Sequence, residues 1–253
     1  MNAIELNARA SCDFDAKLSK TIDVLKQAAL DYAPLSAGEA PSISQASSLG
    51  AEDVVISFLI NSLQLNIGIF VLETGKLHPE TLDVLAKLQA TSLAPVEVFT
   101  PRQESVVHFI NRESAEAMYK SIDLRKACCQ IRKIEPLARA LTGKKAWITG
   151  LRREQSGARA EMSLIDTSDA NRVKLNPLAD WTWGDVWHFI GLHQVDYNAL
   201  HDQHFPSIGC APCTRAISQG EDFRAGRWWW EDEAAKECGL HVATIKTLEG
   251  TTT

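Results

Sequence analysis

The chain has 253 residues, of which 45% are hydrophobic and 23% are charged, an ordinary composition for a globular protein with a full hydrophobic core. Its net charge of −6 excludes nucleic-acid binding through an overall basic surface, so we expect locally placed Arg and Lys to bind any anionic small molecule. The sequence contains neither a basic-then-apolar leader nor a run of about eighteen apolar residues, so we expect a cytoplasmic protein that does not cross a membrane.

The N-terminal part predicts a single amphipathic helix. Residues 15–32 carry Leu18, Ile22, Leu25 and Leu30 at helical spacing. Cys12 precedes this helix, and we expect no function for a single cysteine near a terminus. The chain has six cysteines, and in a reducing compartment they indicate metal binding or catalysis rather than disulfides.

A strand and a glycine turn follow the first helix. The sequence predicts a strand over 43–47 and a helix over about 51–65, joined by a turn that contains Ser47, Ser48 and Gly50. Backbone amides and hydroxyls at a helix N-terminus can surround a phosphate. The turn lacks the Gly-Lys-Ser/Thr ending of a Walker A loop, and the same residues also serve as ordinary caps. The turn alone therefore does not decide between phosphate binding and capping.

Two further strand–helix units extend the predicted sheet. Residues 67–72 form an apolar strand, followed by the turn 73–75 and a helix that opens at Pro79. Residues 95–101 supply a third strand. Because parallel strands place their carboxyl ends on one edge of a sheet, the turn 73–75 belongs beside the Ser/Gly turn. We expect an α/β fold with a doubly wound, mostly parallel sheet.

The next long segment is mostly helical and carries a pair of adjacent cysteines. Cys128 and Cys129 lie among the basic residues Lys126, Arg132 and Lys133. A solvated helix face would have the same composition. The functional interpretation is that the cations offset the negative charge of a thiolate site and of an anion beside it.

An arginine-rich loop follows a predicted strand over 144–150. The loop contains Arg152, Arg153 and Arg159. Arginine at the carboxyl end of a strand suits an oxyanion, because the planar guanidinium binds phosphate or sulfate through two parallel hydrogen bonds. Surface solvation is the alternative.

Short strands and a tryptophan-rich helix are predicted next. Residues 162–176 indicate the strands, and Asp180 or Thr182 can cap the helix. We expect His188 and His193 to be packing or surface residues rather than metal ligands.

Cys210 and Cys213 form a Cys-x-x-Cys pair, which we combine with the adjacent cysteines into one metal site. Four thiolates suit a tetrahedral zinc ion or an iron–sulfur cluster. Side chains of adjacent residues point apart, so Cys128 and Cys129 fit a single zinc ion poorly, whereas each could bind a different iron of a cluster. We favour the cluster, with zinc, a disulfide and unligated thiols as the alternatives.

The C-terminal segment adds two arginines and one cysteine. Arg224 and Arg227 flank a glycine before three tryptophans, and Cys238 stands alone in ECGLH. Cys238 is either an inert passenger or an exposed nucleophile whose thiolate is favoured by nearby cations. We divide the chain into an N-terminal helical segment (1–40), an α/β domain (41–220) and a C-terminal segment (221–253) that we expect to be mobile.

Seven segments together resemble one protein family: SSLGAEDVV, LETGKLHPET, KACCQIRKIEPL, WITGLRREQS, IGCAPCTR, GRWWWE and KECGLH. They are similar to the assimilatory adenylylsulfate (APS) reductases of the iron–sulfur type, within the PAPS/APS reductase family. The resemblance runs from about residue 42 to 242. Its most specific part is the double cysteine with the Cys-x-x-Cys pair, which relatives that reduce 3′-phosphoadenylylsulfate (PAPS) usually lack.

The resemblance implies an adenine-nucleotide fold like that of ATP pyrophosphatases, and a [4Fe-4S] cluster on Cys128, Cys129, Cys210 and Cys213. It implies substrate-binding residues in the phosphate loop, the adenosine loop, the arginine loop and the C-terminal segment: Ser47, Ser48, Gly50, Glu52, Leu72, Thr74, Gly75, Arg152, Arg159, Arg224 and Arg227. Lys133 matches a lysine between cluster and substrate. Glu73, where many relatives have Asp, and Leu49 are small departures from the family pattern.

The resemblance also implies a reaction. Cys238 would attack the sulfate sulfur of APS, expel AMP and carry an S-sulfonate. A dithiol donor, thioredoxin or a glutaredoxin-like protein, would then release sulfite for cysteine biosynthesis. Lys133, Arg159, Arg224 and Arg227 would offset the repulsion between the two anions, and the cluster would not need to carry electrons.

Three alternatives remain at this stage. A reductase of PAPS, or of both sulfonucleotides, would use the same residues. An adenylating enzyme of the ATP pyrophosphatase type would consume ATP, and its reaction would give Cys238 no role. An iron–sulfur regulator is the third, although the acidic net charge and the absence of a helix-turn-helix pattern disfavour a DNA-bound form. The sequence leaves a homo-oligomer open.

Overall fold

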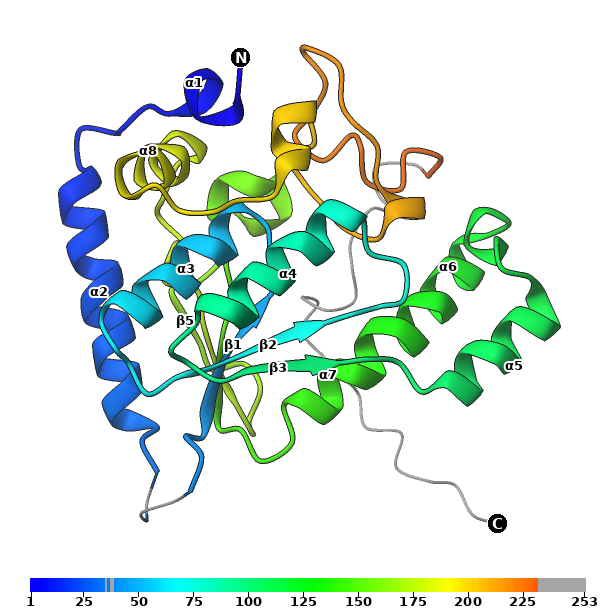
Figure 1. Cartoon of the computed structure of the whole chain (residues 1–253), viewed down its shortest axis with the longest axis horizontal. Helices are drawn as coiled ribbons and strands as arrows, with labels where there is room; N and C mark the ends of the chain where they lie inside the picture. The colour runs from blue at the N-terminus through cyan, green and yellow to red at the C-terminus, as the bar shows by residue number, and fades with distance from the viewer. Residues whose placement is uncertain (35, 37–38, 232–253) are drawn as a thin grey trace.

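The computed structural model describes residues 1–34, 36 and 39–231, coloured along the chain in Figure 1. Six strands form one sheet in the order β3-β2-β1-β4-β6-β5. They are β1 (Ile43–Ser47), β2 (Gly68–Leu72), β3 (Val96–Phe99), β4 (Ala146–Ile148), β5 (Ile165–Asp166) and β6 (Val173–Leu175). All neighbours pair in parallel except β5, which is antiparallel to β6 at the edge of the sheet. The predicted α/β fold with a mostly parallel sheet is confirmed.

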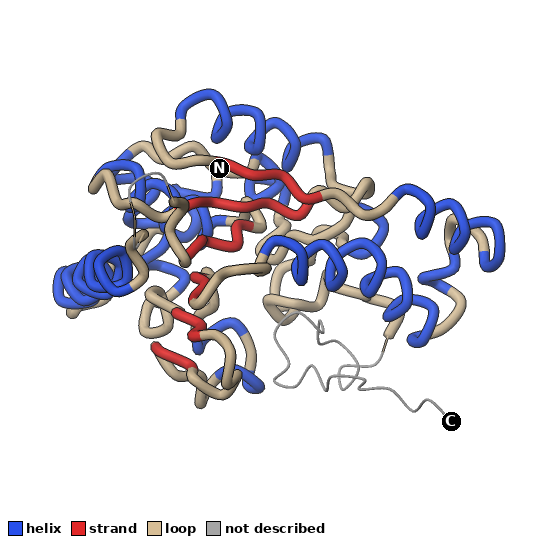
Figure 2. The backbone as a smooth tube through the Cα atoms, turned by 90° about the horizontal axis from the view of Figure 1, so that it is seen from below, coloured by secondary structure: helices blue, strands red, loops and turns tan. Residues whose placement is uncertain are grey.

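Helices flank this sheet on both sides, as Figure 2 shows. The α-helices are α1 (Ala3–Asn7), α2 (Phe14–Asp31), α3 (Ala51–Ser62), α4 (Pro79–Thr91), α5 (Gln103–Glu113), α6 (Ile122–Cys129), α7 (Glu135–Ala140) and α8 (Trp183–His193). Short 3₁₀ or π turns are η1 (Ala117–Tyr119), η2 (Gln130–Ile134), η3 (Arg153–Gln155), η4 (Gly157–Arg159), η5 (Ala199–Gln203) and η6 (Ala211–Cys213). None of the helices in the described ranges combines the length and apolar character that a membrane span requires.

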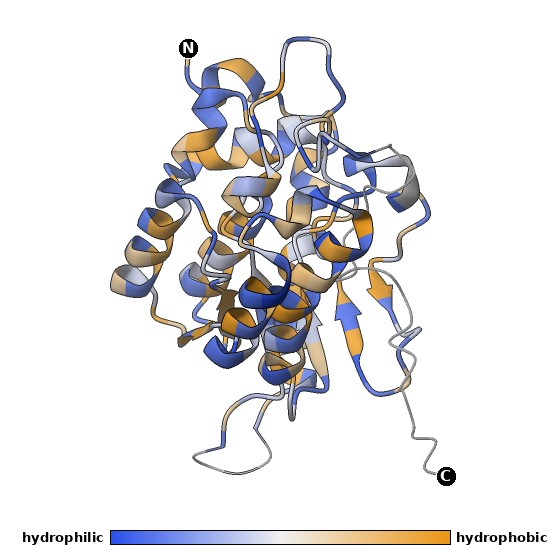
Figure 3. Ribbon diagram, turned by 90° about the vertical axis from the view of Figure 1, so that its right-hand side faces the viewer, coloured by the Kyte–Doolittle hydropathy of each residue, from blue (hydrophilic) through white to orange (hydrophobic). Residues whose placement is uncertain are grey.

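The two faces of the sheet bury separate sets of side chains, because successive residues of a strand point to opposite faces. On β2, Val71 joins the large core that includes side chains of α2, α3 and α8. The neighbouring Phe70 and Leu72 face α7 on the other side, where Leu137 and Leu141 are buried. Figure 3 shows that hydrophobic and hydrophilic residues alternate along the helices. Helices therefore pack against both faces of the sheet, and loops lie at the carboxyl ends of its strands.

Several predicted boundaries agree closely with the structure. β1 covers the predicted range, α4 begins at Pro79, and the side chain of Thr182 caps α8 by accepting a hydrogen bond from the Asp185 amide. His193 packs against aromatic rings, as expected. The predicted helix over 51–65 ends at Ser62, close to the left-handed backbone of Gln64 (φ 51°). Helices α1 and α5 were not among the predicted elements.

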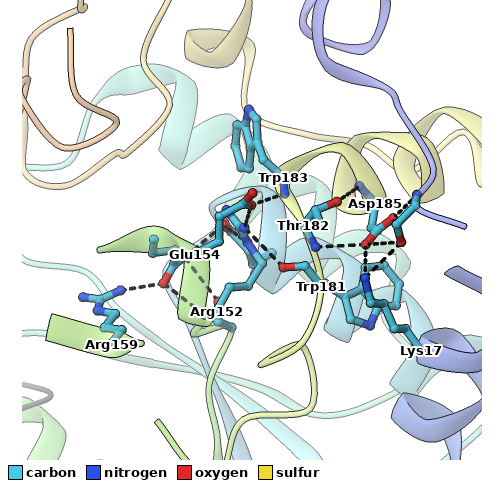
Figure 4. Close-up of polar contacts among 12 residues, drawn as sticks. Lys17, Arg152, Glu154, Arg159, Trp181, Thr182, Trp183 and Asp185 are labelled. Carbon is cyan, nitrogen blue, oxygen red and sulfur yellow. Dashed lines mark hydrogen bonds and ion pairs between the residues drawn. The ribbon is translucent and has the colours of Figure 1, made fainter. Parts of the chain in front are cut away.

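The N-terminal residues are fastened to α8 through one buried carboxylate. The amide and hydroxyl of Ser11 donate to Asp185 Oδ1 at 2.7 and 2.8 Å, and Lys17 Nζ lies 3.2 Å from Oδ2. Burial opposes ionisation of Asp185, but these partners and the Thr182 amide outweigh it and lower its pKa to about 2. Figure 4 shows Lys17 and Thr182 directed at Asp185. We call this cluster the N-terminal clasp.

Candidate active site

A pocket of about 210 Å³ opens at the carboxyl edge of the sheet. It lies where β1, β2 and β4 end, and the segments 206–209 and 223–227 close its other side. The site residues predicted from the sequence that line it are Ser47, Ser48, Gly50, Glu52, Leu72, Thr74, Lys133, Arg159, Arg224 and Arg227. Parallel pairing of β1 with both β2 and β4 places these three loops side by side.

The Ser/Gly turn is held by a buried carboxylate. The amide and hydroxyl of Ser48 both donate to Asp53 Oδ2 at 2.6 Å. Burial raises the pKa of Asp53 to about 6, although the Ser48 hydrogen bonds oppose the shift. Gly150 of the neighbouring loop approaches so closely that a Cβ there would lie 2.4 Å from Asp53 Oδ1. The Ser/Gly turn and the loop after β4 therefore pack directly against each other.

Hydrogen bonds connect the helix after this turn to the arginine loop. Glu52 Oε1 accepts from Arg152 Nε and from Gln155 Nε2, both at 2.9 Å. The Gln155 Oε1 atom in turn accepts from Arg159 Nη1 at 2.5 Å. Arg152 also pairs with Glu154 at 2.7 Å, an arrangement that Figure 4 shows beside Trp183. Glu52 and Gln155 thereby fix the position of Arg159 at the pocket.

A second cavity lies next to the pocket and is lined by all four predicted metal ligands, Cys128, Cys129, Cys210 and Cys213. Thr74 Oγ1 lies 3.2 Å from Cys210 Sγ, which connects the cavity to the loop after β2. Burial raises the pKa of the Cys213 thiol to about 12 and also raises that of Cys128. As free thiols these two groups are protonated at neutral pH, so neither is a good nucleophile.

The donor set of this cavity fits an iron–sulfur cluster. Its four thiols are soft ligands, and Lys76, Arg132 and Lys133 lie among its lining residues, where they can offset the charge of thiolates. The buried Nε1 of Trp228, which also lines the cavity, has no hydrogen-bond partner and can donate to sulfur. Across the part of the chain that the structure describes, no three His, Cys, Asp or Glu side chains are placed to hold a single metal ion.

Lys133 and Arg227 line both the pocket and the four-cysteine cavity. Lys133 lies in the π-helical turn η2, directly after the cysteine-bearing helix α6. Such turns insert a residue into a helix and redirect the side chains that follow. Arg227 is buried, and its Nε has no hydrogen-bond partner. Two cationic side chains thus stand between the pocket and the cysteines.

Two predicted binding residues lie away from the pocket lining. Arg152 is 1% exposed and engages Glu52 and Glu154 behind the pocket. Gly75 adopts a left-handed backbone (φ 68°) and packs against Arg132, whose Nη1 donates to the Thr74 carbonyl at 2.7 Å. Cys238, the predicted nucleophile, lies outside the described residues.

Among the lining residues that the sequence interpretation missed are Asp53, Gln155 and His201. Asp53 follows Glu52 in the first turn of a helix, a position where a second carboxylate could have been noticed. His201 carries no local motif. Burial lowers its pKa to about 4, so its ring is neutral at pH 7, and its Nδ1 lies 2.8 Å from the Phe205 carbonyl.

The fold and the site define an α/β protein with a mostly parallel sheet, a pocket at the carboxyl edge of that sheet and four cysteines beside the pocket. Residues 42–216 match the family described as the phosphoadenosine phosphosulfate reductase domain. The chain belongs to this family.

Curated relatives match most of the chain. A protein of Allochromatium vinosum named adenosine 5′-phosphosulfate reductase is 47% identical over 222 residues, covering 87% of each chain. One of Burkholderia cepacia with the same name is 50% identical over 204 residues, covering 80% of this chain and 82% of its own.

Solved structures share the fold at lower identity. The phosphoadenylyl-sulfate reductase of Candida auris, in a phosphate complex, aligns with a TM-score of 0.60 and 24% identity, covering 81% of this chain and 98% of its own. Yeast FAD synthetase with FAD aligns with a TM-score of 0.59 and 12% identity, covering 85% of this chain and 71% of its own. At these identities the likeness shows the adenine-nucleotide fold alone.

Proposed function

We propose that this chain reduces adenylylsulfate (APS) to sulfite and AMP in sulfate assimilation. The observation that carries the proposal is that Lys133 and Arg227 line both the pocket and the four-cysteine cavity. Cations at this boundary suit a substrate whose negatively charged sulfate end approaches the cysteines. Relatives that are 47% and 50% identical bear the name adenosine 5′-phosphosulfate reductase, which supports the proposal.

The substrate is held along the carboxyl edge of the sheet. We assign its phosphate to the Ser/Gly turn and its adenosine to the loop after β2. The sulfate end belongs near the basic side chains Lys133, Arg159, Arg224 and Arg227, all of which line the pocket. Arg152 acts indirectly, because its guanidinium holds Glu52 and Glu154.

Cys128, Cys129, Cys210 and Cys213 would hold a [4Fe-4S] cluster. When bound, the cluster would tune the electrostatic field near the sulfate end of the substrate. Lys133 would keep its ammonium group between this site and the substrate. The enzyme would work in the cytoplasm, where thiols stay reduced.

The first chemical step belongs to Cys238. Its thiolate attacks the sulfate sulfur, the bond between that sulfur and the bridging oxygen breaks, and AMP leaves with the electron pair. Cys238 then carries an S-sulfonate. Attack of one anion on another is disfavoured in isolation, and each basic side chain at the pocket contributes roughly 3 kcal/mol toward offsetting the repulsion, by analogy with single oxyanion-hole donors.

A dithiol protein, which we take to be thioredoxin, completes the reaction. One of its thiolates attacks Cys238 Sγ, the sulfur–sulfur bond to the sulfonate breaks, and sulfite leaves with the electron pair. The resulting mixed disulfide is resolved by the second thiol, which returns Cys238 as a thiolate. Both electrons come from the dithiol, so the four-cysteine site need not change its redox state.

The test is anaerobic purification followed by measurement of the visible spectrum, iron and sulfide content, and sulfite release from APS and from PAPS. We expect sulfite release to be much faster with APS. In Cys238→Ser, sulfite release and the S-sulfonate adduct seen by mass spectrometry should both be lost, while nucleotide binding and cluster absorbance persist.

Cys12→Ser is the matched control, because Cys12 is an exposed cysteine of the same chain that is not among the pocket-lining residues. It should release sulfite like the wild type. Sulfite release by Cys238→Ser, or a colourless, iron-free preparation with full activity, would contradict the proposed division between Cys238 and the four cysteines. Faster turnover of PAPS would assign the other sulfonucleotide as the substrate.

A further inference from the structure

Three aromatic side chains form a partly exposed group beside the four-cysteine cavity. The ring centroids of Tyr119 and Trp230 lie 4.6 Å apart, and those of Trp229 and Trp230 lie 4.7 Å apart. Tyr119 is 43% exposed and Trp229 is 40% exposed. We call Tyr119, Trp229 and Trp230 the aromatic patch.

The patch is fixed to the segments that carry the cysteines. Tyr119 Oη donates to the carbonyl of Pro212, which lies between Cys210 and Cys213, at 2.7 Å. On the other side, Glu231 forms a buried bidentate pair with Arg125 of α6, at 2.9 and 2.7 Å. Because both edges are held, the exposed rings keep a defined position.

The backbone at Trp228 separates a buried tryptophan from the exposed one. Trp228 has a left-handed backbone conformation (φ 43°), and its side chain is 1% exposed. The guanidinium carbons of Arg125 and Arg227 lie 4.6 and 4.7 Å from the centroid of the Trp228 ring. The next residue, Trp229, turns outward. Single exposed apolar residues are common on protein surfaces, but grouped, rigid aromatic residues are enriched in protein–protein interfaces. The patch therefore has the composition of a docking surface.

The covalent chain places the nucleophile within reach of this patch. Cys238 lies seven residues after Glu231, and seven residues span at most about 25 Å when fully extended. A protein that attacks Cys238 must place its own sulfur within that distance of Glu231. The patch adjoins Glu231 in sequence, so a partner seated on it is within range.

We propose that the aromatic patch is the docking surface for the small dithiol protein that reduces Cys238, an inference that rests on the proposed function. The attacking thiolate and the S-sulfonate are both anions. An uncharged aromatic contact holds the donor without adding negative charge near the reacting sulfurs. The occupant we assign is an apolar surface around the exposed thiol pair of the donor.

The test isolates the donor step. Enzyme is incubated with APS to form the Cys238 S-sulfonate, excess nucleotide is removed, and sulfite release is followed after addition of thioredoxin or of dithiothreitol. For Trp229→Ser we expect the second-order rate constant with thioredoxin to fall about tenfold or more, as for loss of an interface hot spot. The rate constant with dithiothreitol, which needs no docking surface, should stay within about twofold of the wild type. Trp229→Phe, which keeps an aromatic ring, should recover most of the thioredoxin rate.

Leu93→Ser is the matched control. Leu93 is 73% exposed and lies just before β3, at the opposite edge of the sheet from the pocket, so both rate constants should be unchanged. Equal slowing with both reductants in Trp229→Ser would show that the patch acts on the segment that carries Cys238, and would overturn the proposal. Unchanged rates would overturn it as well, and loss of a dimer in sedimentation without a change in either rate would assign the patch to a second copy. Failure of the wild type to form the S-sulfonate would instead contradict the proposed function.

Discussion

At the scale of single residues, the side-chain amide of Gln155 connects Glu52, in the helix after the Ser/Gly turn, to Arg159. Its nitrogen donates to Glu52 at 2.9 Å, and its oxygen accepts from Arg159 at 2.5 Å. Only a side chain with both a donor and an acceptor can make these two bonds at once. Gln155 is therefore a positioning residue for the cation that we assign to the sulfate end of the substrate.

We predict that Gln155→Glu weakens substrate binding. The new carboxylate faces Glu52, and repulsion between the two raises the pKa of one of them. Loss of a hydrogen bond to a charged group is worth about 1.5–3 kcal/mol, so KM should rise about tenfold to a hundredfold, with a smaller effect on kcat.

The pH dependence of KM distinguishes positioning from mere structural damage. In Gln155→Glu, KM should fall as the pH is lowered toward 6, because protonation restores a donor between the two side chains. Gln155→Met, of similar size but without polar atoms, should raise KM without this pH dependence. Identical pH profiles for the two variants would contradict the assignment.

At the scale of elements, local sequence patterns predicted the bounds and caps of strands and helices. The contacts between side chains that are distant in the sequence could not be predicted in this way. The bounds of β1 and the Thr182 cap of α8 depend on neighbouring residues, so the sequence was enough to predict them. The direction of Arg152 depends on Glu52, one hundred positions away in the chain, and no local pattern predicts that contact. His201 reaches the pocket from η5, and no local pattern indicated this.

The cysteines are the exception among long-range features. Their chemistry, rather than a local pattern, indicated that Cys128 and Cys129 join Cys210 and Cys213, and the structure brings all four to one cavity. A shared ligand requirement thus predicts contacts between distant segments where hydrophobic periodicity cannot.

The N-terminal clasp leads to a prediction about stability and pH. The folded-state pKa of Asp185 is about 2, below the ordinary value of 3.8, so its stabilisation is present above pH 3.8 and is lost as the pH falls through 2. We expect Asp185→Asn to lower the free energy of unfolding by roughly 2 kcal/mol at pH 7 and by about half as much at pH 3.

Urea unfolding of wild type and Asp185→Asn at both pH values measures the difference. Asp196→Asn is the control, because Asp196 is 68% exposed in its pair with Lys87, and it should change stability by less than about 1 kcal/mol. A difference for Asp185→Asn that is the same at pH 7 and pH 3 would mean that packing, rather than the charge, accounts for the effect.

At the scale of the whole molecule, one buried ion pair connects the helix of the first cysteine pair to the last described residue. The side chains of Arg125 and Glu231 are 2% and 3% exposed. For two charges this deeply buried, the electrostatic attraction between them does little more than offset the cost of removing both from water. The pair therefore determines how the two segments are arranged more than it adds to the stability of the fold. It holds the aromatic patch and the four-cysteine cavity in one unit, although they come from distant parts of the sequence.

Replacing one partner of this pair should therefore destabilise the protein more than replacing both. Glu231→Ala removes the carboxylate that pairs with the buried Arg125 guanidinium, and we expect a loss of about 3–5 kcal/mol in the free energy of unfolding. The double variant Arg125→Met with Glu231→Leu replaces both charges by apolar side chains, and should be more stable than Glu231→Ala alone. The measurement is urea unfolding of the three proteins at equal iron content, since loss of a cofactor would itself change stability. If the double variant is no more stable than Glu231→Ala, the buried pair is not the unit that joins these parts, and the C-terminal tryptophans must be held by their ring contacts instead.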